Sequence, residues 1–170
     1  SLATRFDAAV YPPQTDTDAL NARPAFAGLM YPVITMGNGT HLGSRTNLLG
    51  ANPSDELIAA FSCEHLVNDR TPTCFICLAA DDDGVPPIEN GLAMFQALRS
   101  KSVPAELHMF EKGKHGFGIR LTKGLPVAAW PDLFLQWAGN NGWVRNVSTE
   151  GRGENPTSGT SPLRSLSWTQ

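Results

Sequence analysis

The 170-residue sequence lacks the features typical of a membrane protein or a nucleic-acid-binding protein. No apolar run approaches the roughly 20 residues that span a bilayer, and the segment from Ser1 to Arg5 lacks the basic end and apolar stretch of a signal peptide. Lysine and arginine total 13 against 16 aspartate and glutamate, a net charge of -3 with no basic run. We therefore expect no nucleic-acid partner and no membrane partner, whereas localisation and oligomeric state stay open.

Cysteine is scarce, and three cysteines in a chain of this length do not predict a disulfide framework. Cys74 and Cys77 have the spacing of a redox or metal pair, but they lie in the apolar run 73–79, which predicts a buried strand. Side chains three apart on a strand point to opposite faces, so we expect two small buried hydrophobes. The four histidines show no metal-ligand spacing with them. We expect neither a metal nor a cofactor.

What the sequence does contain is an alternation of apolar runs and amphipathic segments. With 41% hydrophobic residues, the chain can build a sizeable core. The patterns predict strands over 26–34, 73–79 and 103–110, and helices over 53–61, 87–99 and 128–138. Such alternation predicts an α/β fold, a mostly parallel sheet with helices on both faces. The segment 37–44 is too glycine-rich for regular structure, and residues 144–170 have the composition of a disordered tail.

Two polar motifs follow predicted strands. Asp81, Asp82 and Asp83 come soon after the strand 73–79, and His115 lies in the glycine-rich segment 111–118 after the next strand. In open α/β sheets the ligand crevice lies beyond the carboxyl ends of the strands, where both motifs fall. Histidine can take and return a proton, and a carboxylate fixes its tautomer. An aspartate with His115 would supply that half of a catalytic triad, although a surface histidine and a helix-capping acidic turn explain the pattern equally well.

Several motifs together resemble a known family. They are Tyr31-Pro32-Val33-Ile34, the pattern from His41 to Gly50, the segment Asp81 to Asn90, and the segment Phe110 to Gly118. These motifs resemble the carboxyl-terminal half of α/β-hydrolase fold esterases, in the acetyl-xylan-esterase-like and feruloyl-esterase-like branch related to prolyl oligopeptidase catalytic domains. The resemblance covers residues 1–143. It implies a Ser-Asp-His triad that cleaves short acyl esters, often on carbohydrate, and hence a small-molecule ester as the partner.

The resemblance transfers His115 directly but leaves two registers for the acid. Family aspartates sit four residues before the first proline of a Val-Pro turn. Counting back without a gap from Glu89-Asn90 selects Asp83, whereas counting from Val85-Pro86 selects Asp82. We prefer Asp83, because an ungapped helix would fix the register, and keep Asp82 as the alternative.

The loop 37–50 is expected to cover one side of the pocket, because specificity is often built in loops beyond strand ends. Within it, His41 and Arg45 are candidate substrate contacts. A hydrogen bond that braces the loop is an equally good explanation for each of them.

The nucleophile that the resemblance requires is missing. α/β-Hydrolases hold their serine in a Gly-x-Ser-x-Gly turn, and no such pentapeptide occurs in the sequence. The segment Ser1 to Phe6 resembles the helix after that turn, so we expect the serine upstream of Ser1; Ser44 is a candidate only if the resemblance fails. The prediction is a serine carboxylesterase acting on short acyl esters, acetylated carbohydrate among them, with this chain inactive alone. The alternatives are a prolyl oligopeptidase-type peptidase and a non-catalytic fragment or binding module.

Overall fold

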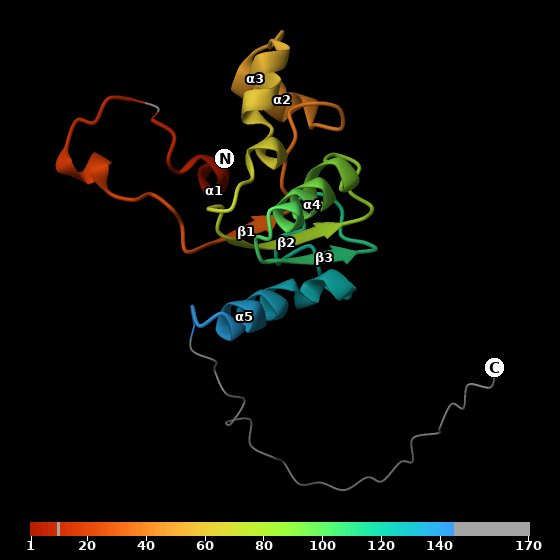
Figure 1. Cartoon of the computed structure of the whole chain (residues 1–170). Coiled ribbons are helices and arrows are strands. Elements are labelled where there is room, and N and C mark those ends of the chain that lie inside the picture. Colours follow the sequence, from red (N-terminus) through yellow and green to blue (C-terminus); the bar gives the residue numbers. More distant parts are fainter. Residues whose placement is uncertain (10, 145–170) are drawn as a thin grey trace, which may run out of the picture.

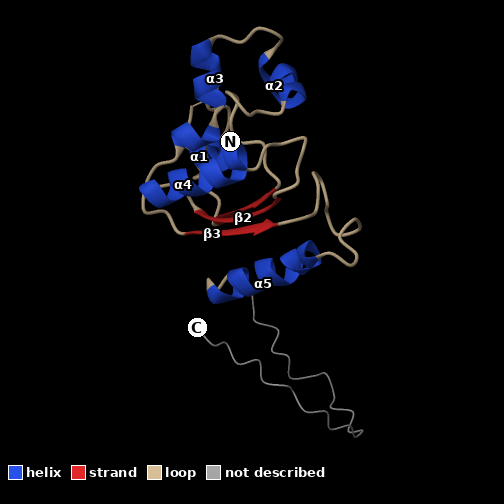
Figure 2. Ribbon diagram, turned by 90° about the vertical axis from the view of Figure 1, so that its right-hand side faces the viewer, coloured by secondary structure: helices blue, strands red, loops and turns tan. Residues whose placement is uncertain are grey.

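A computed structural model describes residues 1–9 and 11–144, and its centre is a three-stranded parallel sheet (Figure 1). The strands β1 (Phe26–Met30), β2 (Thr73–Ala79) and β3 (Ala105–Phe110) lie in the order β1-β2-β3. Helix α4 (Ala93–Ser100) covers one face and α5 (Trp130–Asn140) the other (Figures 1 and 2). The α/β arrangement predicted from the sequence is thereby confirmed.

Further helices and helical turns lie outside these two layers. They are α1 (Leu2–Arg5), η1 (Asp16–Ala19), α2 (Leu42–Leu49), α3 (Asp55–Phe61), η2 (Cys63–Leu66), η3 (Ile88–Leu92) and η4 (Pro126–Ala129). The predicted helices over 53–61, 87–99 and 128–138 correspond to α3, to η3 with α4, and to α5. Among the described residues, no helix combines the length and the apolar character that crossing a membrane would require. The predicted tail lies outside the described residues, apart from Val144.

Strand β2 anchors the core because its side chains are apolar on both faces. Alternate residues belong to two buried clusters: Cys74, Ile76 and Leu78 with Met94 and Leu98 of α4, and Phe75, Cys77 and Ala79 with Trp137 and Ala138 of α5. Burial raises the pKa of the Cys74 thiol to about 11 and that of Cys77 to about 12. The two cysteines are therefore buried hydrophobes on opposite faces, as predicted.

The helix after the acidic turn begins with a π-helical turn, η3, before it becomes α-helical in α4. The amide of Leu92 donates to the carbonyl of Pro87 over 3.0 Å, a five-residue step that holds one residue more than an α-turn. Ile88, the first residue of η3, is 55% exposed although the predicted helix 87–99 includes it. Asn90 and Gly91 are buried instead. A Cβ atom on Gly91 would come within 2.9 Å of the Leu78 side chain, so this close contact requires glycine.

Two predictions about the segment 26–50 are wrong. Strand β1 ends at Met30, because Tyr31 has a φ of 38°, in the left-handed region that turns the chain out of the sheet. The segment 37–50 is partly regular, since it contains α2. That helix has no buried residue and so no apolar stripe to detect. Its first turn is capped by His41, whose side chain accepts the Ser44 amide.

Candidate active site

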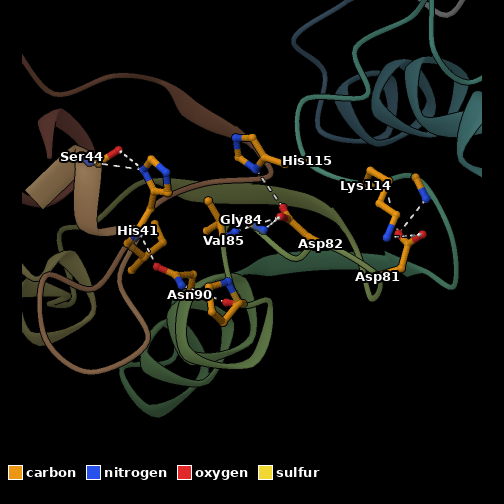
Figure 3. Close-up of polar contacts among 12 residues, drawn as sticks. His41, Ser44, Asp81, Asp82, Gly84, Val85, Asn90, Lys114 and His115 are labelled. Atoms are coloured by element: carbon orange, nitrogen blue, oxygen red, sulfur yellow. Dashed lines mark hydrogen bonds and ion pairs between the residues drawn. The ribbon is translucent and has the colours of Figure 1, made fainter.

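The loops after β2 and β3 meet at the carboxyl end of the sheet. Ala79 pairs with Phe110 at the last position of the parallel ladder, so the chain leaves both strands at the same edge. Asp81, Asp82 and Asp83 follow β2, and Lys114 and His115 follow β3. Figure 3 shows that Asp82 points toward His115 and that Asp81 lies beside Lys114. We call this arrangement of residues 81–85 and 113–115 the Asp–His corner.

Asp82 is the carboxylate that contacts His115. Its Oδ2 lies 2.8 Å from the His115 Nδ1, across 33 residues of sequence (Figure 3). Its Oδ1 accepts the backbone amides of Gly84, at 2.9 Å, and Val85, at 2.8 Å. The Asp82 side chain is only 2% exposed, so both oxygens of a buried carboxylate are satisfied.

The Asp82 contact determines what the imidazole can do. An ionised carboxylate only accepts hydrogen bonds, so Nδ1 of His115 carries the proton and donates it to Asp82. Nε2 is then the basic nitrogen, and no group among residues 1–9 and 11–144 hydrogen-bonds to it. The His115 side chain is 44% exposed. The arrangement can therefore accept a proton from solvent or from a ligand and stabilise the imidazolium that results.

Asp83 has a different partner, and the preference for it as the acid beside His115 is wrong. Its side chain is 83% exposed, and its Oδ2 accepts from the Lys114 ammonium over 2.8 Å. Between Asn90 and the aspartates the helix begins with the π-helical turn η3, which holds one residue more than an α-turn. A count back from Asn90 that assumes no gap therefore selects an acid one position too late. The count from Val85-Pro86 selects Asp82, as the structure does.

Asp81 binds mainly the backbone of the loop that carries His115, and its Oδ2 also lies 3.9 Å from the Lys114 ammonium. Its Oδ1 accepts the amides of Gly113, at 2.9 Å, and Lys114, at 2.8 Å. The hydrogen bond from the Lys114 amide is the largest of the contacts that lower the pKa of Asp81. In turn, the hydrogen bond to Asp83 raises the pKa of the Lys114 ammonium. Asp81 and Asp83 thus both contact Lys114, the first chiefly through its amide and the second through its ammonium, whereas Asp82 contacts His115.

Tyr31 packs against the imidazole and was missed at the sequence level. Its ring lies edge-on to the ring of His115, at 5.3 Å between centroids, and to that of Phe117, at 4.8 Å. The Tyr31 amide still donates to the carbonyl of Cys77 over 2.7 Å, which holds the unusual φ of this residue in place. The sequence signals for Tyr31 were its place after β1 and its presence in the Tyr31-Pro32-Val33-Ile34 motif, and neither indicates a contact with His115.

Asn90 was also missed, and it joins the connection between β1 and α2 to the turn after β2. Its Oδ1 accepts the amides of Ile34, at 2.9 Å, and Thr35, at 3.2 Å. Its Nδ2 donates to the carbonyls of Gly39, at 2.9 Å, and Pro86, at 2.8 Å (Figure 3). The residue is 1% exposed, and all four of its hydrogen-bonding positions are filled.

His41 and Arg45, the candidate substrate contacts, are both bound within their own loop. His41 Nδ1 lies 3.0 Å from the Ser44 hydroxyl and accepts the Ser44 amide at 3.2 Å. Arg45 Nη1 donates to the carbonyl of Met36 over 3.2 Å. These are loop-bracing hydrogen bonds, and a role in substrate binding stays a prediction. Within the described part of the chain, no three His, Cys, Asp or Glu side chains gather as a metal site.

Most of the described chain matches a known protein family and two known sequences. Residues 26–141 match the model of the prolyl oligopeptidase family. The chain is 39% identical over 139 residues to endo-1,4-beta-xylanase B of Butyrivibrio fibrisolvens, covering 82% of this chain and 20% of that protein. It is 33% identical over 132 residues to an acetylxylan esterase of Xylanibacter ruminicola, covering 74% of this chain and 25% of that protein. The chain therefore spans a quarter or less of these two relatives.

Solved structures of hydrolases also resemble this chain. An acetyl ester-xyloside bifunctional hydrolase from Caldicellulosiruptor lactoaceticus superposes with a TM-score of 0.78 at 34% identity, over 84% of this chain and 52% of that one. A carboxylesterase from Lactobacillus plantarum gives 0.63 at 26% identity, over 84% of this chain and 55% of that one. The resemblance and the partial α/β-hydrolase fold predicted from the sequence are thereby confirmed. The chain belongs to the prolyl oligopeptidase family.

Proposed function

We propose that this chain carries the acid and the base of a serine ester hydrolase of the α/β-hydrolase class, with Asp82 as the acid and His115 as the base. The observation that supports the proposal is the 2.8 Å contact between His115 Nδ1 and the buried Asp82 carboxylate. It leaves Nε2 as a base at the carboxyl edge of a parallel sheet, where such sites are built. The esterases among the relatives support the same reaction class.

The proposed reaction uses a serine that these 170 residues do not supply, because the sequence contains no Gly-x-Ser-x-Gly. As the serine oxygen bonds to the ester carbonyl carbon, Nε2 of His115 accepts the serine proton, and Asp82 stabilises the imidazolium. His115 then returns the proton to the departing alcohol, and an acyl-serine remains. A water molecule deprotonated by the same nitrogen attacks the acyl group, which releases the carboxylic acid and restores the serine.

The proposed substrates are short acyl esters, with acetylated carbohydrate as the first class to test. The names of two relatives support this choice, an acetylxylan esterase and an acetyl ester-xyloside hydrolase. Tyr31, at the edge of the corner, is the nearest aromatic ring to His115 for which a contact is described. His41 and Arg45 remain the residues of this chain that are predicted to contact the substrate.

Labelling of the whole protein, meaning this chain together with the segment that carries the serine, tests the proposal. We expect a fluorophosphonate probe to label one serine in a Gly-x-Ser-x-Gly sequence upstream of Ser1. His115→Ala should abolish labelling and lower the hydrolysis of p-nitrophenyl acetate by at least about 10³-fold. His108→Ala, which changes a half-buried histidine on β3, serves as the control. A whole protein that the probe does not label would refute the serine-hydrolase assignment.

The 170-residue chain provides a second arm of the same test. It should hydrolyse p-nitrophenyl acetate no faster than buffer, because it lacks the proposed nucleophile. A rate that is measurable in the chain and lost in His115→Ala would show that a nucleophile lies within these residues.

A peptidase is the second candidate, because the matched family is named for prolyl oligopeptidase. The Asp–His corner would serve acyl transfer from an amide or from an ester, so its geometry does not separate the two. Profiling the whole protein on acetyl esters and on proline-containing peptides separates them. We expect cleavage of the esters only, and preferential cleavage after proline would favour the peptidase.

A further inference from the structure

We propose that Asp81 is a positioning residue, which holds the loop that carries His115 so that the imidazole reaches Asp82. This inference rests on the proposed function, since it assigns a role in preparing the proposed base. It concerns a residue that touches neither the imidazole nor, in the proposal, the substrate. The role is distinct from those of the neighbouring aspartates.

The geometry places one oxygen of Asp81 at the junction of the two loops. Its Oδ1 accepts two consecutive amides, those of Gly113 and Lys114, which lie 32 and 33 residues further along the chain (Figure 3). Two donors from adjacent residues fix both the position and the direction of the peptide between them. That peptide directly precedes His115. The side chain of Asp81 is 28% exposed, so these bonds are partly shielded from water.

The loop needs such a contact because its own conformation is unfavourable. Lys114 has a φ of 60°, in the left-handed region that residues with a Cβ atom adopt at a cost. Gly113 is confined, since a Cβ atom there would lie 3.0 Å from Ala79 Cβ and 3.1 Å from Phe117 Cδ1. The loop therefore combines a close approach to the core with a strained residue. The hydrogen bonds to Asp81 stabilise this conformation over a relaxed one.

Asp82 and Asp83 do not hold the backbone of the loop that carries His115. The ion pair between Asp83 and the Lys114 ammonium joins side chains that are 83% and 64% exposed, and exposed pairs of this kind contribute little. Asp82 binds the imidazole itself and the amides of its own turn. Among the three aspartates, Asp81 alone binds the backbone of the His115 loop in the described residues.

Three substitutions of Asp81 separate acceptor geometry from charge. Asp81→Asn keeps an oxygen acceptor in the same place and removes the charge, whereas Asp81→Glu keeps the charge and moves the acceptor by one methylene. Asp81→Ala removes both. The matched control is Asp83→Ala, which deletes the exposed neighbour that pairs with the Lys114 side chain.

The readout is the imidazole of His115 in the folded 170-residue chain, measured by NMR as ring ¹⁵N chemical shifts and the low-field Nδ1 proton. We expect Asp81→Ala to lose the low-field proton and Asp81→Glu to weaken it. Asp81→Asn and Asp83→Ala should retain it. The amides of Gly113 and Lys114 should exchange faster in the same two variants that perturb the ring.

An unchanged His115 signature in folded Asp81→Ala would overturn the proposal, even if the two amides exchanged faster. If Asp81→Ala does not fold, Asp81→Glu decides, and a wild-type signature there overturns it as well. Loss of the signature in folded Asp81→Asn would contradict the role of acceptor geometry. None of these readouts needs the serine, so failure of the proposed function, a whole protein without esterase activity, is distinguishable from failure of this inference.

Discussion

The Asp–His corner and the segment that contains α2 and α3, residues 42–61, are held in different ways. In the corner, Asp81 and Asp82 bind groups 32 and 33 residues away, and the Asp82 carboxylate is buried. Helices α2 and α3 contain no buried residue, and their caps, His41 and Ser54, bind amides three residues on. The corner is thus set by contacts with buried groups and with a distant loop, whereas α2 depends on local contacts. Helix α3 has one long-range hydrogen bond, from Arg5 Nη1 to the carbonyl of Ala60 over 3.1 Å, at the protein surface. We therefore place the proposed acid and base in the corner, where contacts from both loops fix the positions of the side chains.

The largest effect on stability should come from Asn90, which joins the connection 31–41, ahead of α2, to the turn after β2 that contains the Asp–His corner. Asn90→Ala leaves the amides of Ile34 and Thr35 and the carbonyls of Gly39 and Pro86 without their partner. We expect the free energy of unfolding to fall by about 3 kcal/mol, because each lost bond leaves a buried polar group unsatisfied. Urea unfolding, followed by tryptophan fluorescence, measures it.

The matched control for Asn90 is Asn38→Ala, which changes an exposed asparagine in the segment that Asn90 binds. It should change the free energy of unfolding by less than about 0.5 kcal/mol. Equal effects of the two substitutions would show that the four hydrogen bonds of Asn90 do not stabilise the fold.

A smaller effect is expected at His41, the cap of α2. His41→Ala removes the acceptor of the Ser44 amide and should cost about 1 kcal/mol or less, confined to that helix. Hydrogen exchange should quicken in residues 42–49 and stay unchanged at Gly113 and Lys114. His65→Ala provides the control, since His65 is 62% exposed and only 3.7 Å from Glu64. Faster exchange in the corner would mean that the two regions are coupled more tightly than the contacts indicate.

The sequence predicts those parts of the fold that depend on local pattern. The run 73–79 predicts β2 because both faces of the strand are buried, and the Ser54 cap predicts the start of α3. The sequence also predicts that an aspartate lies near His115, because the carboxyl ends of parallel strands lie at one edge of the sheet. The choice between Asp82 and Asp83 was not, since it depends on a π-helical turn that no periodicity reveals.

The residues that sequence reasoning missed act through distant contacts. Asn90 binds Ile34 across 56 residues, and a polar residue near the start of a helix gives no sign of such a partner. In the sequence, Tyr31 continues the apolar run of β1. In the structure, its positive φ turns the chain out of the strand, and its ring packs beside His115. Helix α2 escaped detection because a solvent-exposed helix with glycine and polar residues lacks the periodicity that identifies a buried face.

The central claim is that Asp82, and not Asp83, orients the base His115. Its most direct test is the kcat/KM of the whole protein on p-nitrophenyl acetate for Asp82→Asn and Asp83→Asn, two identical changes at adjacent positions. We predict a loss of about 10⁴-fold for Asp82→Asn, because the amide no longer fixes the imidazole tautomer, and little change for Asp83→Asn. A large loss in Asp83→Asn with near-normal activity in Asp82→Asn would contradict the account.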